Sequence, residues 1–93
     1  MIKIEEGYLY RGGEKIGRIE DNDIYEHGGE RLGYFDGTKI YDHAGKEIGR
    51  VNGNHISVPH DTKVIDLEDN LQIIVGGTYS DVARAAIRLL LGE

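Results

Sequence analysis

Apolar positions recur along this chain with a period of 16 residues. Gly17, Gly33 and Gly49 are 16 apart, and each has an aliphatic residue directly before it and an apolar residue two positions after it. A period of this size indicates an array of small supersecondary units, none of which buries its apolar side alone. The pattern therefore predicts an architecture before it indicates any activity.

Each unit has the pattern of a β-hairpin. In the third unit, residues 39–41 predict a strand, 42–45 a turn and 46–51 the return strand. Asp42 and Gly45 fit the first and fourth positions of a type I turn whose glycine adopts the left-handed region. Asn52-Gly53 is a strong two-residue hairpin signal and leads into the next unit.

Two features of the array depart from a simple hairpin. Ile48 and Val51 are three apart, so strict alternation would place them on opposite faces; either the strand is bulged or both faces are partly covered. The fourth unit is degenerate, with residues 59–62 in place of the glycine turn. We expect Asp69-Asn70 to form its second turn and 71–75 to close the array as a continuous apolar strand.

The pattern becomes helical after Gly76-Gly77. Ser80 is the expected N-cap, with Asp81 in the first turn. Asp81, Arg84 and Arg88 form a narrow polar stripe, which leaves an apolar arc wider than the ~100° of an ordinary surface helix. We therefore expect the helix to plug the β array and also to contact a second copy of the chain. The expected interface residues are Val82, Ala86, Leu89, Leu90 and Leu91.

These patterns predict a single domain over residues 1–93. Its fold class is mainly β, with four quasi-repeated 16-residue β-hairpins in a pseudo-four-fold arrangement plus one C-terminal α-helix. The hairpin array covers 8–75, and the glycine linker and helix cover 76–93. A chain of 93 residues suffices for one modest core.

Charge and composition narrow the function classes. The net charge is −6 and the eleven Lys and Arg are scattered among acids, so we expect no binding to nucleic acid. The absence of cysteine excludes disulfides, thiolate metal sites and cysteine nucleophiles. No secretory signal pattern precedes Glu5, and the longest apolar run, 89–91, is too short to span a bilayer. We expect a cytoplasmic protein without membrane contact.

The unit Ile-Tyr-Asp-x-x-Gly-x-x-Ile-Gly-Arg-Val-x-Gly, at 40–53, resembles the repeat of the four-fold beta-flower domains, which are small and mostly bacterial. The resemblance covers Tyr8 to Val75 and implies four hairpins around a pseudo-four-fold axis, but no defined activity or site. The same short phrase is similar to parts of PRC-barrel domains and of the tyrosine–aspartate repeats of large surface proteins. The 16-residue period argues against the former, and the short chain with its own helix against the latter.

A recurring tyrosine is the first candidate for a binding site. Tyr10, Tyr25 and Tyr41 occupy the same position of successive units, with Ser57 in the fourth. If this position faces the symmetry axis, it lines a small aromatic cup with hydroxyl groups, as binding sites often do. If it faces outward, it provides cross-strand packing.

The junction between the array and the helix is the second candidate. Gly76, Gly77, Thr78 and Ser80 lead into a helix N-terminus, where free amides and the helix dipole favour a phosphate or carboxylate. The junction lacks the lysine of a phosphate loop. The alternative is a flexible connector with an N-cap.

Other chemistry is weakly indicated. His27 and His43 occupy equivalent turn positions, but the first and fourth units offer no matching ring of histidines, so exposed turn residues are expected. The acids at 66, 68 and 69 lack the spacing of a calcium loop. We expect no metal site, no cofactor and no enzymatic activity.

The leading functional prediction is therefore a non-enzymatic interaction or assembly module that self-associates through its C-terminal helix, most simply as a dimer, or that binds a protein partner. The alternative is a small-ligand binding protein for an anionic metabolite or nucleotide. It would use the tyrosine face or the 76–80 junction.

Overall fold

The computed structural model describes residues 1–59 and 64–92. Its strands form one ten-stranded sheet in the order β10-β1-β2-β3-β4-β5-β6-β7-β8-β9, so β1 to β9 follow one another in sequence order and β10 lies beside β1. All adjacent pairs are antiparallel except β1 and β10, which run parallel. The elements are β1 (Ile2–Glu5), β2 (Tyr8–Arg11), β3 (Glu14–Glu20), β4 (Asp23–Glu26), β5 (Arg31–Asp36), β6 (Lys39–Asp42), β7 (Glu47–Asn52), β8 (His55–Ser57), β9 (Val64–Asp66), α1 (Leu67–Ile73), β10 (Ile74–Val75) and α2 (Asp81–Leu91).

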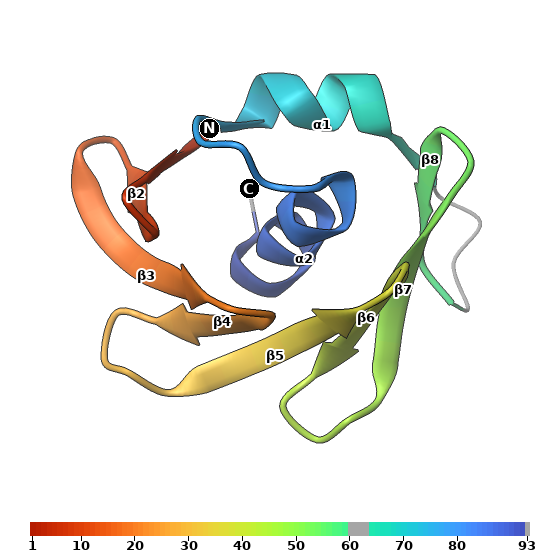
Figure 1. The fold of residues 1–93 in the computed structure, drawn as a ribbon, viewed down its shortest axis with the longest axis horizontal. Coiled ribbons are helices and arrows are strands. Elements are labelled where there is room, and N and C mark those ends of the chain that lie inside the picture. Colours follow the sequence, from red (N-terminus) through yellow and green to blue (C-terminus); the bar gives the residue numbers. More distant parts are fainter. Residues whose placement is uncertain (60–63, 93) are drawn as a thin grey trace.

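The sheet bends around α2, which lies inside its curve (Figure 1). The helix contacts strands β4 to β7 as well as α1 and β10. Helix α1 bridges the two edge strands of the sheet, β9 and β10 (Figure 1). The core is built from inward-facing strand residues and the middle of α2. Its buried apolar members are Ile2, Ile4, Leu9, Ile19, Ile24, Phe35, Ile40, Ile56, Ile74, Ala83, Ala85, Ala86 and Ile87.

A β-bulge in each of the first three units explains the three-residue spacing of apolar positions. Ile40 pairs with Gly49 and Tyr41 with Glu47, which leaves Ile48 as the extra residue. The register shifts in the same way in the first and second units. A bulge redirects the side chains that follow it, so Ile48 and Val51 both pack against the core. Of the two alternatives, the bulged strand is confirmed.

One backbone hydrogen bond recurs with the period of the sequence. The N–H groups of residues 19, 35, 51 and 67 donate to the carbonyls of residues 7, 22, 38 and 54, at 2.8–3.0 Å. Each bond joins one unit to the connection that precedes it. The fourth bond persists even though Leu67 begins a helix instead of continuing a strand. The degenerate fourth unit therefore keeps the backbone anchor of the other three.

The predicted glycine turns are confirmed. The N–H of Gly45 donates to the carbonyl of Asp42 at 3.0 Å, and Gly45 has a φ of +84°. Gly29 makes the equivalent bond in the second unit, with a φ of +97°. The Asn52-Gly53 signal also marks a hairpin, although Asn52 pairs with His55 and the loop itself is Gly53-Asn54.

The expectation for the end of the array is wrong in two places. Asp69 and Asn70 lie in α1 instead of a turn, and 71–75 is not one strand, because only Ile74 and Val75 are extended. The physical reason is a helix N-cap: the carboxylate of Asp66 accepts hydrogen bonds from the N–H groups of Glu68 and Asp69. Of the turn expected at 59–62, residues 60–62 lie outside the described residues.

Strand β1 was not expected from the repeat, and it pairs with β10. The C-terminal helix is confirmed, and Ser80 is its N-cap. Within residues 1–59 and 64–92, no helix is long and apolar enough to cross a membrane.

Candidate functional site

The recurring tyrosine lies on the outer face of the sheet. Tyr10, Tyr25 and Tyr41 each follow a fully buried residue of the same strand, which points inward toward α2. Because side chains alternate along a strand, the tyrosines point away from the core. The three residues therefore do not line an inward-facing cup.

Tyr8 and Tyr34 also lie on this outer face, where three of the tyrosine rings contact cations. The ammonium nitrogen of Lys15 lies 4.0 Å from the ring centroid of Tyr8, and the guanidinium carbon of Arg18 lies 4.1 Å from that of Tyr25. Tyr34 of the second unit stacks on Tyr41 of the third unit, with a distance of 5.0 Å between the ring centroids. Arg31 lies over Tyr34 at 5.1 Å. Cations are attracted to the faces of aromatic rings at these distances, so the outer face of β2 to β6 carries an aromatic and cationic row.

A small pocket opens on this face between β2, β3 and β4. We call it the first-hairpin pocket; its volume is about 180 Å³ and it is lined by Tyr8, Lys15, Gly17, Arg18, Glu26 and His27. It combines two permanent cations, an imidazole, a carboxylate and an aromatic wall. Such convergent polar groups beside an aromatic surface are typical of ligand sites, although this pocket is smaller than those that hold drug-sized molecules.

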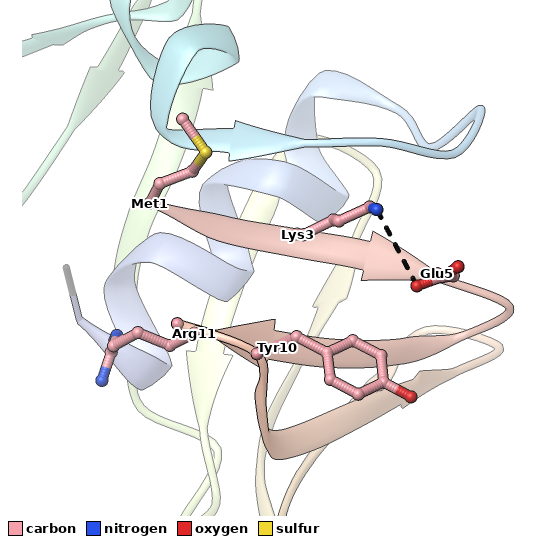
Figure 2. A pocket seen from close by; sticks show the side chains of 7 residues that line it. Met1, Lys3, Glu5, Tyr10 and Arg11 are labelled. Atoms are coloured by element: carbon pink, nitrogen blue, oxygen red, sulfur yellow. Dashed lines mark ion pairs between the residues drawn. The ribbon is translucent and has the colours of Figure 1, made fainter.

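A larger hollow of about 670 Å³ lies over β1 and β2 (Figure 2). Its charged groups already have partners in the chain. The ammonium of Lys3 lies 3.9 Å from the carboxylate of Glu5. Arg11 points away from Tyr10 (Figure 2) and donates to the carbonyls of Leu91 and Gly92 at 3.2 and 2.9 Å. Arg11 thereby caps the C-terminus of α2, so its guanidinium serves the fold, and Lys3 shares this hollow with the acid Glu5.

The junction at 76–80 is organised around a buried arginine. Arg84, only 8% exposed, donates to the carbonyls of Ile74, Gly76 and Gly77 at 2.8–3.0 Å and to that of Tyr79 at 3.3 Å. The expected polar stripe of α2 is therefore not a solvated face at this position. Gly76 and Gly77 have φ values of +93° and +68°, which favour glycine.

The side chains of the junction thus have structural roles. The hydroxyl of Ser80 accepts from the N–H of Ala83 at 3.2 Å and caps the helix. Thr78 is exposed. Whether Gly76, Gly77, Thr78 and Ser80 also bind an anion stays a prediction.

The residues expected at a helix interface lie inside the curve of the sheet. Ala86 is fully buried, and Val82, Leu89, Leu90 and Leu91 are partly buried against the core of the same chain. The two methyl carbons of Leu90 lie against Gly33, and one of Leu89 lies against Gly49. Enclosure by the sheet therefore accounts for the wide apolar arc of α2 without a second copy.

Among residues 1–59 and 64–92, no three His, Asp or Glu side chains are placed to hold a metal ion. His27 and His43 both lie in exposed turns, as expected. His60 lies outside the described residues.

Sequence reasoning missed the first-hairpin pocket because its members come from different positions of the unit. Lys15 and Arg18 are ordinary charged strand residues when considered singly, and Tyr8 lies outside the recurring tyrosine position. The available signal was a comparison of units: Tyr8 occupies the position that Asp23 and Lys39 occupy in the next two. That difference removes an acid from beside the two cations.

Comparisons with family models, curated proteins and solved structures find no match to this chain. The resemblance of the repeat to the four-fold beta-flower domains accordingly stays a prediction.

Proposed function

We propose that this protein is a non-catalytic binding module that recognises a small molecule through the outer face of its sheet. The observation that carries the proposal is the aromatic and cationic row over β2 to β6. Small-molecule sites are lined mainly by hydrophobic and aromatic side chains with a few polar or charged groups. Here five of the six tyrosines of the chain lie on one face, and three of them stack against cations.

The rest of the molecule supports this placement of function. The sheet encloses α2, and Arg11 and Arg84 are engaged in holding its two ends. The exposed large apolar side chains of the described residues are Met1, Tyr8, Val64 and Leu71, of which only Tyr8 belongs to the row. The outer face thus combines exposed aromatic area with charge, as a ligand site requires.

A thermal-shift screen with a broad panel of metabolites and nucleotides tests the proposal. We expect saturable stabilisation by at least one compound class, because a ligand that binds only the folded state raises the unfolding temperature. Tyr25→Ala should abolish this stabilisation, because it removes the ring beneath Arg18. Leu71→Ala, on the exposed side of α1, is the matched control and should leave it unchanged. A flat panel, or stabilisation that survives Tyr25→Ala and Tyr8→Ala, would overturn the proposal.

Self-association through α2 stays a separate prediction. Its support in the sequence is the wide apolar arc of α2, and packing of α2 within its own chain also accounts for that arc. Native mass spectrometry tests it directly, because a dimer has twice the mass of the 10.4 kDa chain.

The relation to the four-fold beta-flower domains is also part of what we propose. It is supported by the backbone hydrogen bond that recurs in all four units. An experimental structure in which the units superpose by successive quarter turns would establish the predicted symmetry, and units without a common axis would refute it.

A further inference from the structure

We infer that the first-hairpin pocket binds the oxyanion group of a small molecule, a phosphate monoester or a carboxylate. This inference rests on the proposed function and names the site and the ligand chemistry. Its support comes from the differences between equivalent positions of the repeated units. Because the first three units share the same bulged strand pairing, equivalent strand positions can be compared side chain by side chain.

Each unit has four outward positions on its two paired strands, and in the first unit three of them, Tyr8, Lys15 and Arg18, line the pocket. In the second and third units these positions contain an acid that neutralises an arginine. Arg31 pairs with Asp23 at 3.3 Å, and Arg50 pairs with Glu47 at 2.6 Å. In the first unit the four positions hold two tyrosines and two cations and no acid. They are Tyr8, Tyr10, Lys15 and Arg18.

The two cations of the first unit are available to a ligand. Within the described part of the chain, Lys15 makes no ion pair, and its ammonium lies over the ring of Tyr8. Arg18 approaches Glu20 at 3.5 Å, but the two side chains are 38% and 63% exposed. Exposed pairs of this kind contribute little free energy, so a bound anion can compete with Glu20 for the guanidinium.

Stacking also prepares these cations for an anion. The guanidinium carbon of Arg18 lies over the ring of Tyr25, and a guanidinium carries its N–H groups in its own plane, where they can donate in parallel to two oxygens. The ring restricts the side chain before the ligand arrives, which lowers the entropic cost of binding. The imidazole of His27 also lines the pocket, and its ring N–H can donate a further hydrogen bond to an anion.

The remaining lining residue, Glu26, limits what the pocket accepts. Its carboxylate lines the pocket but lies beyond ion-pair distance of Lys15 and Arg18. A multiply charged polymer would bring further phosphates toward this acid and toward a chain of net charge −6. One oxyanion on a small molecule satisfies the two cations without that repulsion, and a volume of about 180 Å³ suits such a group.

Backbone NMR titration of the full chain tests the inference. The probes are phenyl phosphate, benzoate and, as a charge control, benzyltrimethylammonium. We expect saturable shifts of the amides at 15–18 and 25–28 with phenyl phosphate, and weaker ones with benzoate, because the phosphate carries nearly two charges at pH 7. Benzyltrimethylammonium should leave these amides unmoved. Inorganic phosphate separates recognition of the oxyanion alone from recognition that also needs the ring.

The units themselves provide the variants. Arg18→Gln or Lys15→Gln should weaken phenyl phosphate binding about tenfold, the loss of one charge-assisted hydrogen bond. Tyr8→Asp places beside Lys15 the acid that the second unit holds at Asp23, and it should abolish binding without removing either cation. Arg50→Gln, at the position of the third unit equivalent to Arg18 and outside the row, is the matched control and should change nothing. All four side chains lie on the outer face, and the amide spectrum of each variant reports directly whether it folds.

The outcomes separate this inference from the proposed function. Shifts at the first-hairpin pocket that Tyr8→Asp removes would support the inference. Absence of anion binding, while another compound class stabilises the protein in a Tyr25-dependent manner, would overturn the inference and leave the proposed function standing. Anion binding that maps to the 76–80 junction, or that survives Tyr8→Asp, would also overturn it. If no compound of any class binds the outer face, both fall.

Discussion

Single glycines decide how closely α2 approaches the sheet. Gly33 and Gly49, at the same position of successive units, are buried and face inward, and leucines of α2 lie against them. A methyl group on Gly33 would meet the two methyl carbons of Leu90 at 2.9 Å and also collide with the carbonyl of Tyr41. The period of the sequence is therefore set in part by the helix that the sheet encloses.

Gly33→Ala should lower the free energy of unfolding by roughly 1–3 kcal/mol, the usual cost of overpacking a filled core. Urea denaturation followed by circular dichroism measures the change. Gly28→Ala is the control, because a methyl there meets only the mobile carboxylate of Glu26. Equal stability of wild type and Gly33→Ala would show that the helix is not seated against this glycine.

Asp42 fixes the turn of the third hairpin electrostatically. Its carboxylate accepts the N–H of Lys46 at 3.0 Å and that of Ala44 at 2.9 Å. The bond from Lys46 is the main cause that lowers the pKa of Asp42 from its ordinary value of 3.8; the bond from Ala44 and the charges of His43 and Lys46 act in the same direction, and desolvation opposes them. A carboxylate bound in this way stabilises the fold above its unfolded pKa.

The stabilisation should therefore be complete above pH 3.8 and disappear as the pH falls through the lower, folded pKa. A carbon-detected NMR titration of Asp42, compared with the same residue in a peptide of 39–50, measures the shift. Asp42→Asn should remove this part of the acid dependence of unfolding. A titration midpoint no lower than that of the peptide would contradict the turn geometry.

At the scale of elements, Arg84 joins α2 to the parallel edge of the sheet. Its guanidinium has no carboxylate within ion-pair distance in the described residues, and it is held instead by four carbonyls between residues 74 and 79. Hydrogen bonds of this number satisfy a buried cation that would otherwise be costly. The arginine fixes the loop between β10 and α2, and with it the pairing of β10 with β1.

Arg84→Met should lower the free energy of unfolding by roughly 3 kcal/mol or more, because it leaves buried carbonyls without donors. Arg84→Lys should recover only part of this loss, because a compact ammonium with three donors cannot reach all four carbonyls that the wider, planar guanidinium reaches. Hydrogen exchange should also become faster at β1 and β10 before it does at β5. The control is Arg31→Met, which loses only surface contacts, one of 3.3 Å to Asp23 and one with the ring of Tyr34.

The same elements show what the sequence could reveal. The hairpins, their glycine turns and the C-terminal helix follow from local signals, such as Asp42 with Gly45 and the Ser80 N-cap, and the structure confirms them. The bulge at Ile48 could be suspected but not chosen, because it depends on how the strand pairs. Helix α1 was missed because the repeat suggested a strand, and the Asp66 N-cap with acids at 68 and 69 outweighed it. The partners of Arg84 and the stacking of Arg18 on Tyr25 depend on contacts between elements, which no local pattern reveals.

At the scale of the whole molecule, the sheet, α1 and α2 close on one another within a single chain. Ala83, Ala85, Ala86 and Ile87 are fully buried or nearly so on successive positions of α2, which means that the helix is surrounded on more than one side. Leu90 extends this enclosure to the last turn, where it contacts Gly33. A helix placed in this way belongs to the core, so its apolar residues stabilise the folded chain whether or not two copies associate.

Leu90→Glu separates these two roles of α2. If the helix is core, the variant should lose at least about 2 kcal/mol of unfolding free energy, the lower range for removing a buried leucine, and the wild-type unfolding temperature should not depend on protein concentration. If the helix is an interface, the variant should instead be a folded monomer, and the wild-type unfolding temperature should rise with concentration. Leu71→Glu, at a side chain 45% exposed on α1, controls for the added charge. Thermal unfolding over a hundredfold range of protein concentration, with sedimentation equilibrium on both variants, distinguishes the two outcomes. Because the sheet of the same chain encloses α2, we expect the outcome in which the helix is core.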